Sequence, residues 1–135
     1  MSSAATRTFT VEQANRMLPL VRRIVRDIVD SHQTWQRAVQ SYETAATWTR
    51  ADSPSTQLKV LEGDVRRLAM EIEGYLVELR ELGVDFKGFE QGLVDFPGER
   101  EGRVVCLCWK LDEDAVKFWH EVSDGYAGRQ PISDS

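Results

Sequence analysis

A long amphipathic helix is predicted by residues 14–46, which read ANRMLPLVRRIVRDIVDSHQTWQRAVQSYETAA. Apolar positions, with one histidine among them, recur by four and three without a break: Ala14, Leu18, Val21, Val25, Ile28, His32, Trp35, Val39, Tyr42 and Ala46. This spacing is the heptad seam of a helix that packs nearly parallel or antiparallel to another helix. Thr10 and Gln13 are spaced as a capping box and Phe9 stands where a hydrophobic staple belongs, so we expect the helix to begin at Thr10.

Pro19 interrupts this seam early. Its nitrogen cannot donate to the carbonyl of Asn15, and its ring crowds the preceding turn. We therefore expect a kink, or a short first helix and a restart, near Leu18.

A second helix is predicted after residues 47–55, TWTRADSPS, in which Ser53 and Pro54 suit a cap and a first helical turn. Its seam again steps by three and four, through Leu58, Leu61, Val65, Leu68, Ile72, Tyr75, Leu79 and Leu82. Gly83 suits the left-handed residue that ends a helix. Because a short loop joins two such helices, residues 10–83 are predicted to form an antiparallel, coiled-coil-like helical hairpin.

The C-terminal third changes to the period of strands. Residues 93–96 and 103–109 are predicted to pair as a β-hairpin across the polar loop 97–102, and residues 84–86 suit a short strand. Asp112 suits the cap of a short last helix, with acidic residues in its first turn. The prediction is an α+β, mainly α, single domain over residues 1–135. In it, the β-hairpin, the short last helix and the tail (84–135) pack at the base of the long helical hairpin (10–83).

Composition limits the partners of this chain. The 135 residues carry a formal net charge of −5, and mean hydropathy is −0.40. The one basic cluster, Arg22, Arg23 and Arg26, is flanked by Asp27 and Asp30, so nucleic acid is not expected as a partner. No apolar run is long enough for a membrane span and the first eight residues lack the apolar core of a signal peptide, so a cytoplasmic protein is expected.

The two cysteines lie on one predicted strand. Cys106 and Cys108 point to the same face of residues 103–109, too far apart along the chain to bridge without distortion, so free thiols are expected. Val105, Leu107 and Trp109 make the other face apolar as well, which indicates a strand covered on both sides. A C-x-C pair could hold a soft metal, but no further cysteine completes a four-ligand set. The prediction is therefore two small buried hydrophobic residues, with no metal or cofactor.

Residues 109–129, WKLDEDAVKFWHEVSDGYAGR, concentrate the candidate functional side chains. Together with an acid from the preceding strand, the candidate ligand-binding residues are Asp95, Trp109, Trp119, His120, Tyr126 and Arg129. In a structural interpretation, His120 hydrogen-bonds a carboxylate such as Asp95, and Arg129 clamps the tail by pairing with Asp95, Glu121 or Asp124. In a functional interpretation, the same side chains line a pocket for an anion or a metal. Either way, Asp95, His120 and Arg129 are predicted to share one polar network.

The other histidine, His32, lies in the seam of the first helix. A satisfied core histidine, or one paired with Glu71 of the second helix, is favoured there over a ligand.

Several short motifs carry a resemblance to a known family. They are Phe9-Thr10, Ala14-Asn15, Leu18-Pro19, Gly92 to Pro97, Leu107-Cys108-Trp109 with Leu111, Trp119-His120, and Gly125 to Arg129. On these residues the chain resembles the bacterial domain-of-unknown-function family numbered 2203, over nearly its whole length. The resemblance implies a small helical protein of unestablished function and assigns no catalytic residue.

Two functions from different classes follow from these patterns. The first is a non-catalytic interaction or oligomerisation module that forms a homodimer, or binds another protein, through the helical hairpin. The second is a small-ligand-binding protein with its site around Asp95, Trp109, His120 and Arg129. An enzyme that uses His120 as an acid or base is less favoured, because the sequence contains no nucleophile elbow, phosphate loop or metal set.

Overall fold

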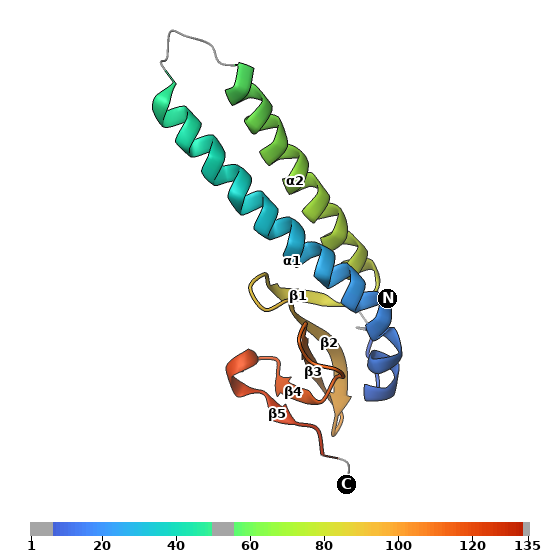
Figure 1. Ribbon diagram of the computed structural model, residues 1–135. Coiled ribbons are helices and arrows are strands. Elements are labelled where there is room, and N and C mark those ends of the chain that lie inside the picture. The colour runs from blue at the N-terminus through green and yellow to red at the C-terminus, as the bar shows by residue number, and fades with distance from the viewer. Residues whose placement is uncertain (1–6, 50–55, 134–135) are drawn as a thin grey trace, which may run out of the picture.

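A helical hairpin stands on a five-stranded antiparallel sheet in the computed structural model, which describes residues 7–49 and 56–133 (Figure 1). The helices are α1 (Val11–Trp48) and α2 (Thr56–Glu81). The strands are β1 (Asp85–Gly88), β2 (Leu93–Arg100), β3 (Arg103–Lys110), β4 (Phe118–Glu121) and β5 (Gln130–Pro131), and they follow one another across the sheet in chain order. The predicted cap at Ser53 and Pro54 lies outside the described residues. Neither described helix has the length and apolar composition that crossing a membrane requires.

The predicted start of α1 is confirmed. Thr10 Oγ1 accepts a hydrogen bond from the Gln13 nitrogen at 3.0 Å, and Gln13 Oε1 accepts one from the Thr10 nitrogen at 2.9 Å. Phe9 is buried and meets the ring of Phe96 edge-on, with 5.4 Å between centroids. The residue before the cap therefore also anchors the helix to the sheet.

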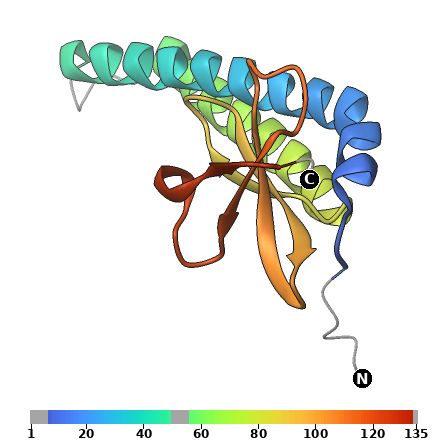
Figure 2. The ribbon, with the colours of Figure 1, turned by 90° about the horizontal axis from the view of Figure 1, so that it is seen from below.

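Pro19 lies inside α1, which continues unbroken through it. The expected restart of the helix is therefore wrong. The alternative, a kink, is present: Figures 1 and 2 both show the first turns of α1 at an angle to the rest of the helix. One missing hydrogen bond bends a helix of this length without ending it.

The seam of α1 is buried only in its first half. The buried side chains of α1 are Ala14, Leu18, Val21, Ile24, Val25, Ile28 and Val29. Because the sheet covers only the base of the hairpin (Figure 1), the outer half of α1 packs against α2, apart from a contact between His32 and Phe89 of the β1–β2 connection. His32 stacks on Phe89 with 4.1 Å between ring centroids, and Glu71 pairs with Arg67, so the predicted pairing of His32 with Glu71 is wrong.

The two faces of the sheet have different environments. The face toward the helices is apolar and buried, and it includes Val94, Phe96, Val105, Leu107, Trp109 and Trp119. At Gly92 a Cβ atom would lie 2.8 Å from Val25 Cγ1, which shows how closely α1 approaches the sheet. The opposite face carries Asp95, Cys106, Cys108 and His120, since Asp95 pairs with Cys108 and Cys106 pairs with His120 in register.

The predicted β-hairpin is present and longer than expected. β2 and β3 stay paired to Arg100 and Arg103, which leaves the two-residue turn Glu101–Gly102 in place of the predicted loop 97–102. Both turn residues have positive φ, 52° and 80°. Such a turn matches the right-handed twist of the paired strands, and glycine takes the second position without strain.

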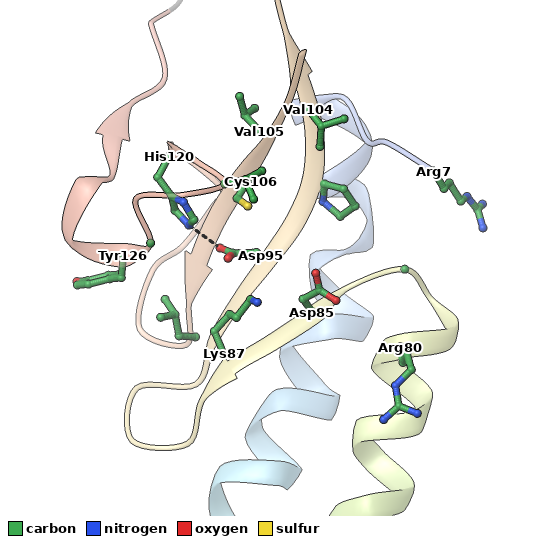
Figure 3. Close-up of a pocket in the computed structure, with 15 residues that line it drawn as sticks. Arg7, Arg80, Asp85, Lys87, Asp95, Val104, Val105, Cys106, His120 and Tyr126 are labelled. Carbon is green, nitrogen blue, oxygen red and sulfur yellow. Dashed lines mark hydrogen bonds and ion pairs between the residues drawn. The ribbon is translucent and has the colours of Figure 1, made fainter. Parts of the chain in front are cut away.

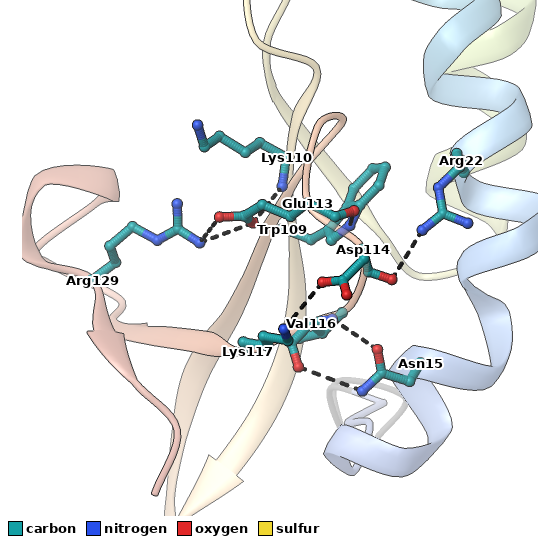
Figure 4. Close-up of polar contacts among 9 residues, drawn as sticks. All are labelled: Asn15, Arg22, Trp109, Lys110, Glu113, Asp114, Val116, Lys117 and Arg129. Atoms are coloured by element: carbon teal, nitrogen blue, oxygen red, sulfur yellow. Dashed lines mark hydrogen bonds and ion pairs between the residues drawn. The ribbon is translucent and has the colours of Figure 1, made fainter.

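The predicted last helix after Asp112 is wrong. Backbone groups of this segment, which a helix would bond internally, form hydrogen bonds with side chains of α1 instead (Figure 4). Asn15 of α1 accepts from the Val116 nitrogen at 2.7 Å and donates to the Val116 carbonyl at 3.4 Å, and Arg22 donates to the Asp114 carbonyl at 3.2 Å. The chain then runs extended as β4 and pairs with β3, so the sheet is larger than the small hairpin expected from sequence.

Candidate functional site

A cluster of three potential metal ligands lies on the sheet face that points away from the helices. Asp95 comes from β2, Cys106 from β3 and His120 from β4, and one ligand atom from each lies within 4.8 Å of the others. Three adjacent strands present these side chains because the register places them on one face. Asp95 and His120 are the only buried polar or charged residues in the part of the chain that the structure describes.

The two ring nitrogens of His120 face different acceptors. Nδ1 lies 2.8 Å from the backbone carbonyl of Glu121, and Nε2 lies 3.0 Å from Asp95 Oδ1. A carbonyl oxygen only accepts, so Nδ1 carries a proton. Nε2 then either carries a second proton toward the carboxylate or offers its lone pair to a cation.

Cys106 completes the cluster as a half-buried free thiol. Burial, and secondarily the negative charge of Asp95, raise the pKa of Cys106 to about 11. The same causes raise the pKa of Cys108 to about 12. Neither cysteine is thus an activated nucleophile, because a reactive thiolate needs a lowered pKa.

A pocket opens above this cluster (Figure 3). Its volume is about 640 Å³, and Asp95, Cys106 and His120 lie in its wall together with Lys87 of β1 and Tyr126. The volume is within the usual range of small-molecule sites, roughly 300 to 1,000 Å³. The three-ligand cluster is therefore accessible to a ligand even though two of its side chains are buried.

Arg129 belongs to a separate ion pair. Its guanidinium donates to both carboxylate oxygens of Glu113, at 3.0 and 2.8 Å (Figure 4). The same guanidinium lies 3.9 Å from the centroid of the Phe118 ring. Among the described residues, Arg129 bonds to neither Asp95 nor His120, so the predicted network of three is reduced to the Asp95–His120 contact. The predicted clamp on the tail has Glu113 as its partner in place of Asp95, Glu121 or Asp124.

The candidate aromatic residues divide between the two faces. Tyr126 lines the pocket beside Asp95 and His120. Trp109 is fully buried in the core and its indole nitrogen donates to the Glu113 carbonyl at 2.9 Å, while Trp119 lies beneath Arg100. The structure thus brings Asp95, His120 and Tyr126 together in the wall of the pocket and places Trp109 and Trp119 on the other face of the sheet. Arg129 does not line the pocket, but its guanidinium lies 4.9 Å from the centroid of the Tyr126 ring.

Sequence reasoning missed Cys106, Lys87 and Glu113. The sequence pattern relates Cys106 only to Cys108. Because residues after Asp112 are predicted to be helical, it does not place His120 on a strand beside Cys106. The available signal was the aromatic pair Phe118 and Trp119, because aromatic residues are enriched in strands and a short apolar run suits a strand as well as a helix.

The arrangement argues against a cysteine-based catalytic triad. A triad needs the nucleophile at one ring nitrogen of the histidine and the carboxylate at the other. Here Asp95 contacts Nε2, while Nδ1 is already bonded to a backbone carbonyl. Both the carboxylate and the thiol therefore have only Nε2 to share, so the histidine cannot link the two as it does in a triad.

The chain was also compared with known proteins. Neither the comparison with curated proteins nor the comparison with solved structures gave a match. The family model described as "Uncharacterized conserved protein (DUF2203)" matches residues 7–132. Because that match covers nearly the whole chain, this protein belongs to the DUF2203 family.

Proposed function

We propose that this protein binds a divalent transition-metal cation, of which zinc is the type, through Asp95, Cys106 and His120. The observation that carries the proposal is the convergence of a carboxylate, a thiol and Nε2 of one histidine while Nδ1 is held by the Glu121 carbonyl. Nitrogen, sulfur and carboxylate oxygen are the donors that zinc takes in proteins.

The separations suit such a cation after small side-chain movements. Tetrahedral bonds of about 2.0 to 2.3 Å set neighbouring ligand atoms roughly 3.3 to 3.8 Å apart. The Nε2–Oδ1 distance of 3.0 Å is slightly shorter than this, and the cluster limit of 4.8 Å is somewhat longer. Metal binding therefore requires small movements of the Cys106 and Asp95 side chains.

The contact at Nδ1 supports the same function. A metal-ligating histidine usually donates its other ring N–H to a carbonyl or carboxylate, which fixes the tautomer that leaves the ligating nitrogen unprotonated. The Glu121 carbonyl does this for His120. A cation would also favour the Cys106 thiolate, since a coordinating thiol loses its proton despite burial.

Calorimetry on the full chain tests the proposal. After treatment with a chelator, the wild-type protein is expected to bind one equivalent of Zn²⁺. Cys106→Ala is expected to weaken binding by at least about tenfold, the smallest loss usually seen even for contacts outside the coordination shell.

Cys108→Ala is the matched control, because Cys108 is a free cysteine on the same strand and the same face but outside the cluster. It keeps all three proposed ligands, although its thiol lies beside Asp95, and should bind Zn²⁺ more tightly than Cys106→Ala. Failure of the wild type to bind Zn²⁺, or equal affinity in Cys106→Ala and the wild type, would overturn the proposal. Both cysteine variants remove only a thiol, so the comparison stands even if His120 variants do not fold.

Self-association is a second candidate function, favoured by apolar side chains that are exposed along the helical hairpin. Trp48 is 83% exposed, Met70 69% and Val60 56%. We propose that a second copy of this chain covers these residues in a four-helix arrangement, as helical hairpins often do.

Sedimentation equilibrium tests this association. The wild type is expected to sediment as a dimer, and a charge at an exposed apolar position, as in Met70→Glu, should shift it toward the monomer. A wild-type monomer of 15.4 kDa at micromolar concentration would exclude the dimer.

A further inference from the structure

We infer that the pocket beside the cluster takes a small oxyanion, a carboxylate or phosphate group on an apolar body, that binds the metal and pairs with Lys87. The inference rests on the proposed function, because the position that the oxyanion occupies exists only when Asp95, Cys106 and His120 hold a cation. Three protein ligands leave one position of a tetrahedral zinc site open. That position faces the pocket, since all three ligands line it.

The charges around the pocket select an anion. A divalent cation bound by the Asp95 carboxylate and the Cys106 thiolate is electrically balanced. The remaining charged side chains of the wall are the cationic Arg7, Arg80 and Lys87 and the acidic Asp85. Once the cation is bound, this excess of positive charge favours an anion as the further ligand.

Lys87 is the cation best placed to pair with the ligand. Its side chain comes from the strand next to Asp95 and its ammonium group is directed into the pocket (Figure 3). It makes no ion pair with any residue that the structure describes, whereas Arg80 pairs with Glu73 at 3.9 Å.

Apolar side chains line much of the rest of the pocket. Leu93, Pro97, Val104, Val122 and Tyr126 contribute to its wall. Such a wall favours an aliphatic or aromatic body behind the charged head. An aromatic carboxylate should therefore bind more tightly than acetate.

A titration of the cobalt-loaded full chain tests the inference, because Co²⁺ takes zinc sites and reports new ligands by its visible absorption. Benzoate and inorganic phosphate are the two oxyanion probes, acetate reports the contribution of the apolar body, and benzamide is the neutral analogue of benzoate. We expect benzoate or phosphate to change the spectrum and benzamide to leave it unchanged. The tighter of the two oxyanions assigns the head group.

Lys87→Met is expected to weaken oxyanion binding roughly tenfold, as loss of one close charge pair does, while Co²⁺ affinity stays the same. Lys59→Met, the same change on the exposed face of α2, should alter neither affinity. Equal oxyanion affinity in Lys87→Met and the wild type, or a response to benzamide as strong as that to benzoate, overturns the inference. A wild type that binds cobalt but ignores both oxyanions also overturns it and leaves metal binding intact; a wild type that binds no cobalt overturns both.

Discussion

His120 Nε2 lies 3.0 Å from Asp95 Oδ1 although 25 residues separate the two in the chain. Both side chains are almost completely buried, 3% and 6% exposed. A buried carboxylate and imidazole remain stable only when each has a partner of suitable charge or hydrogen-bonding character. In the proposed metal complex the cation is that partner for both side chains, and Cys106 is the third ligand.

Zinc should therefore stabilise the folded protein. A ligand at about 100 times its dissociation constant adds roughly 2.7 kcal/mol to the free energy of unfolding. We expect a melting temperature several degrees higher with Zn²⁺ than with a chelator, measured by circular dichroism. Cys106→Ala should lose this increase and Cys108→Ala should keep it. An equal increase in all three proteins would point to zinc binding elsewhere.

The Arg129–Glu113 pair should hold the C-terminal segment on the sheet. The two side chains are only 12% and 16% exposed. Glu113→Gln should lower the free energy of unfolding by about 1 to 3 kcal/mol, because it weakens charge-assisted bonds to a largely buried guanidinium. Urea denaturation measures the change. Arg67→Met, which breaks the exposed pair with Glu71, should cost less than about 1 kcal/mol. Equal losses in the two variants would contradict a clamp.

Asn15 should determine the path of the segment before β4. Asn15→Ala leaves the backbone nitrogen and carbonyl of buried Val116 without their side-chain partner. The expected loss is about 1 to 3 kcal/mol, the cost of an unsatisfied buried polar group. Asn15→Asp keeps the acceptor and should lose less. Hydrogen exchange of the Val116 amide gives a local readout, and unchanged protection in Asn15→Ala would contradict this role.

Gly92 should be intolerant of any side chain. Its φ is +63°, and a Cβ would lie 2.8 Å from Val25 Cγ1 and 2.9 Å from Leu111 Cβ. Gly102 has φ +80° with nothing within 4 Å. Both alanine variants incur left-handed strain of about 1 to 2 kcal/mol. Gly92→Ala should lose a further 1 to 3 kcal/mol or so from overpacking. Similar unfolding midpoints for the two variants would contradict this prediction, because they would mean that α1 shifts away from residue 92 without loss of stability.

Asp114 should titrate below the usual range of aspartate. Its hydrogen bond to Lys117, together with the charge of that ammonium group, lowers the pKa of the Asp114 carboxyl. A carboxyl group whose pKa is lower in the folded chain than in the unfolded chain stabilises the fold at pH values above its unfolded pKa. That contribution is lost as the pH falls through the lowered value. Carbon NMR of the side-chain carboxyl should show the pKa return toward its usual value in Lys117→Gln and stay low in Lys59→Gln.

The sequence alone determined the two helices, the cap at Thr10, the left-handed Gly83 and the β-hairpin of β2 and β3. These features depend on residues a few positions apart, so hydrophobic periodicity and capping residues predict them from the sequence. The presence of Asp95 and His120 in one contact was also predicted, because two polar residues in apolar surroundings need partners.

Only the tertiary structure decided the path of residues 112–121 and, with it, the site. Locally, Asp112 and the acids after it favour a helix, and a helix would have used its own backbone bonds. Asn15, 101 positions away from Val116, takes those bonds instead, and β3 offers a free edge to Phe118–Glu121. The register of β4 places His120 on the same face of the sheet as Asp95 and Cys106. Arg129, which was predicted to join His120 and Asp95, pairs with Glu113 instead. Contacts between residues so distant in sequence have no local pattern, and they outweigh local propensity when they bury apolar surface and satisfy backbone groups together.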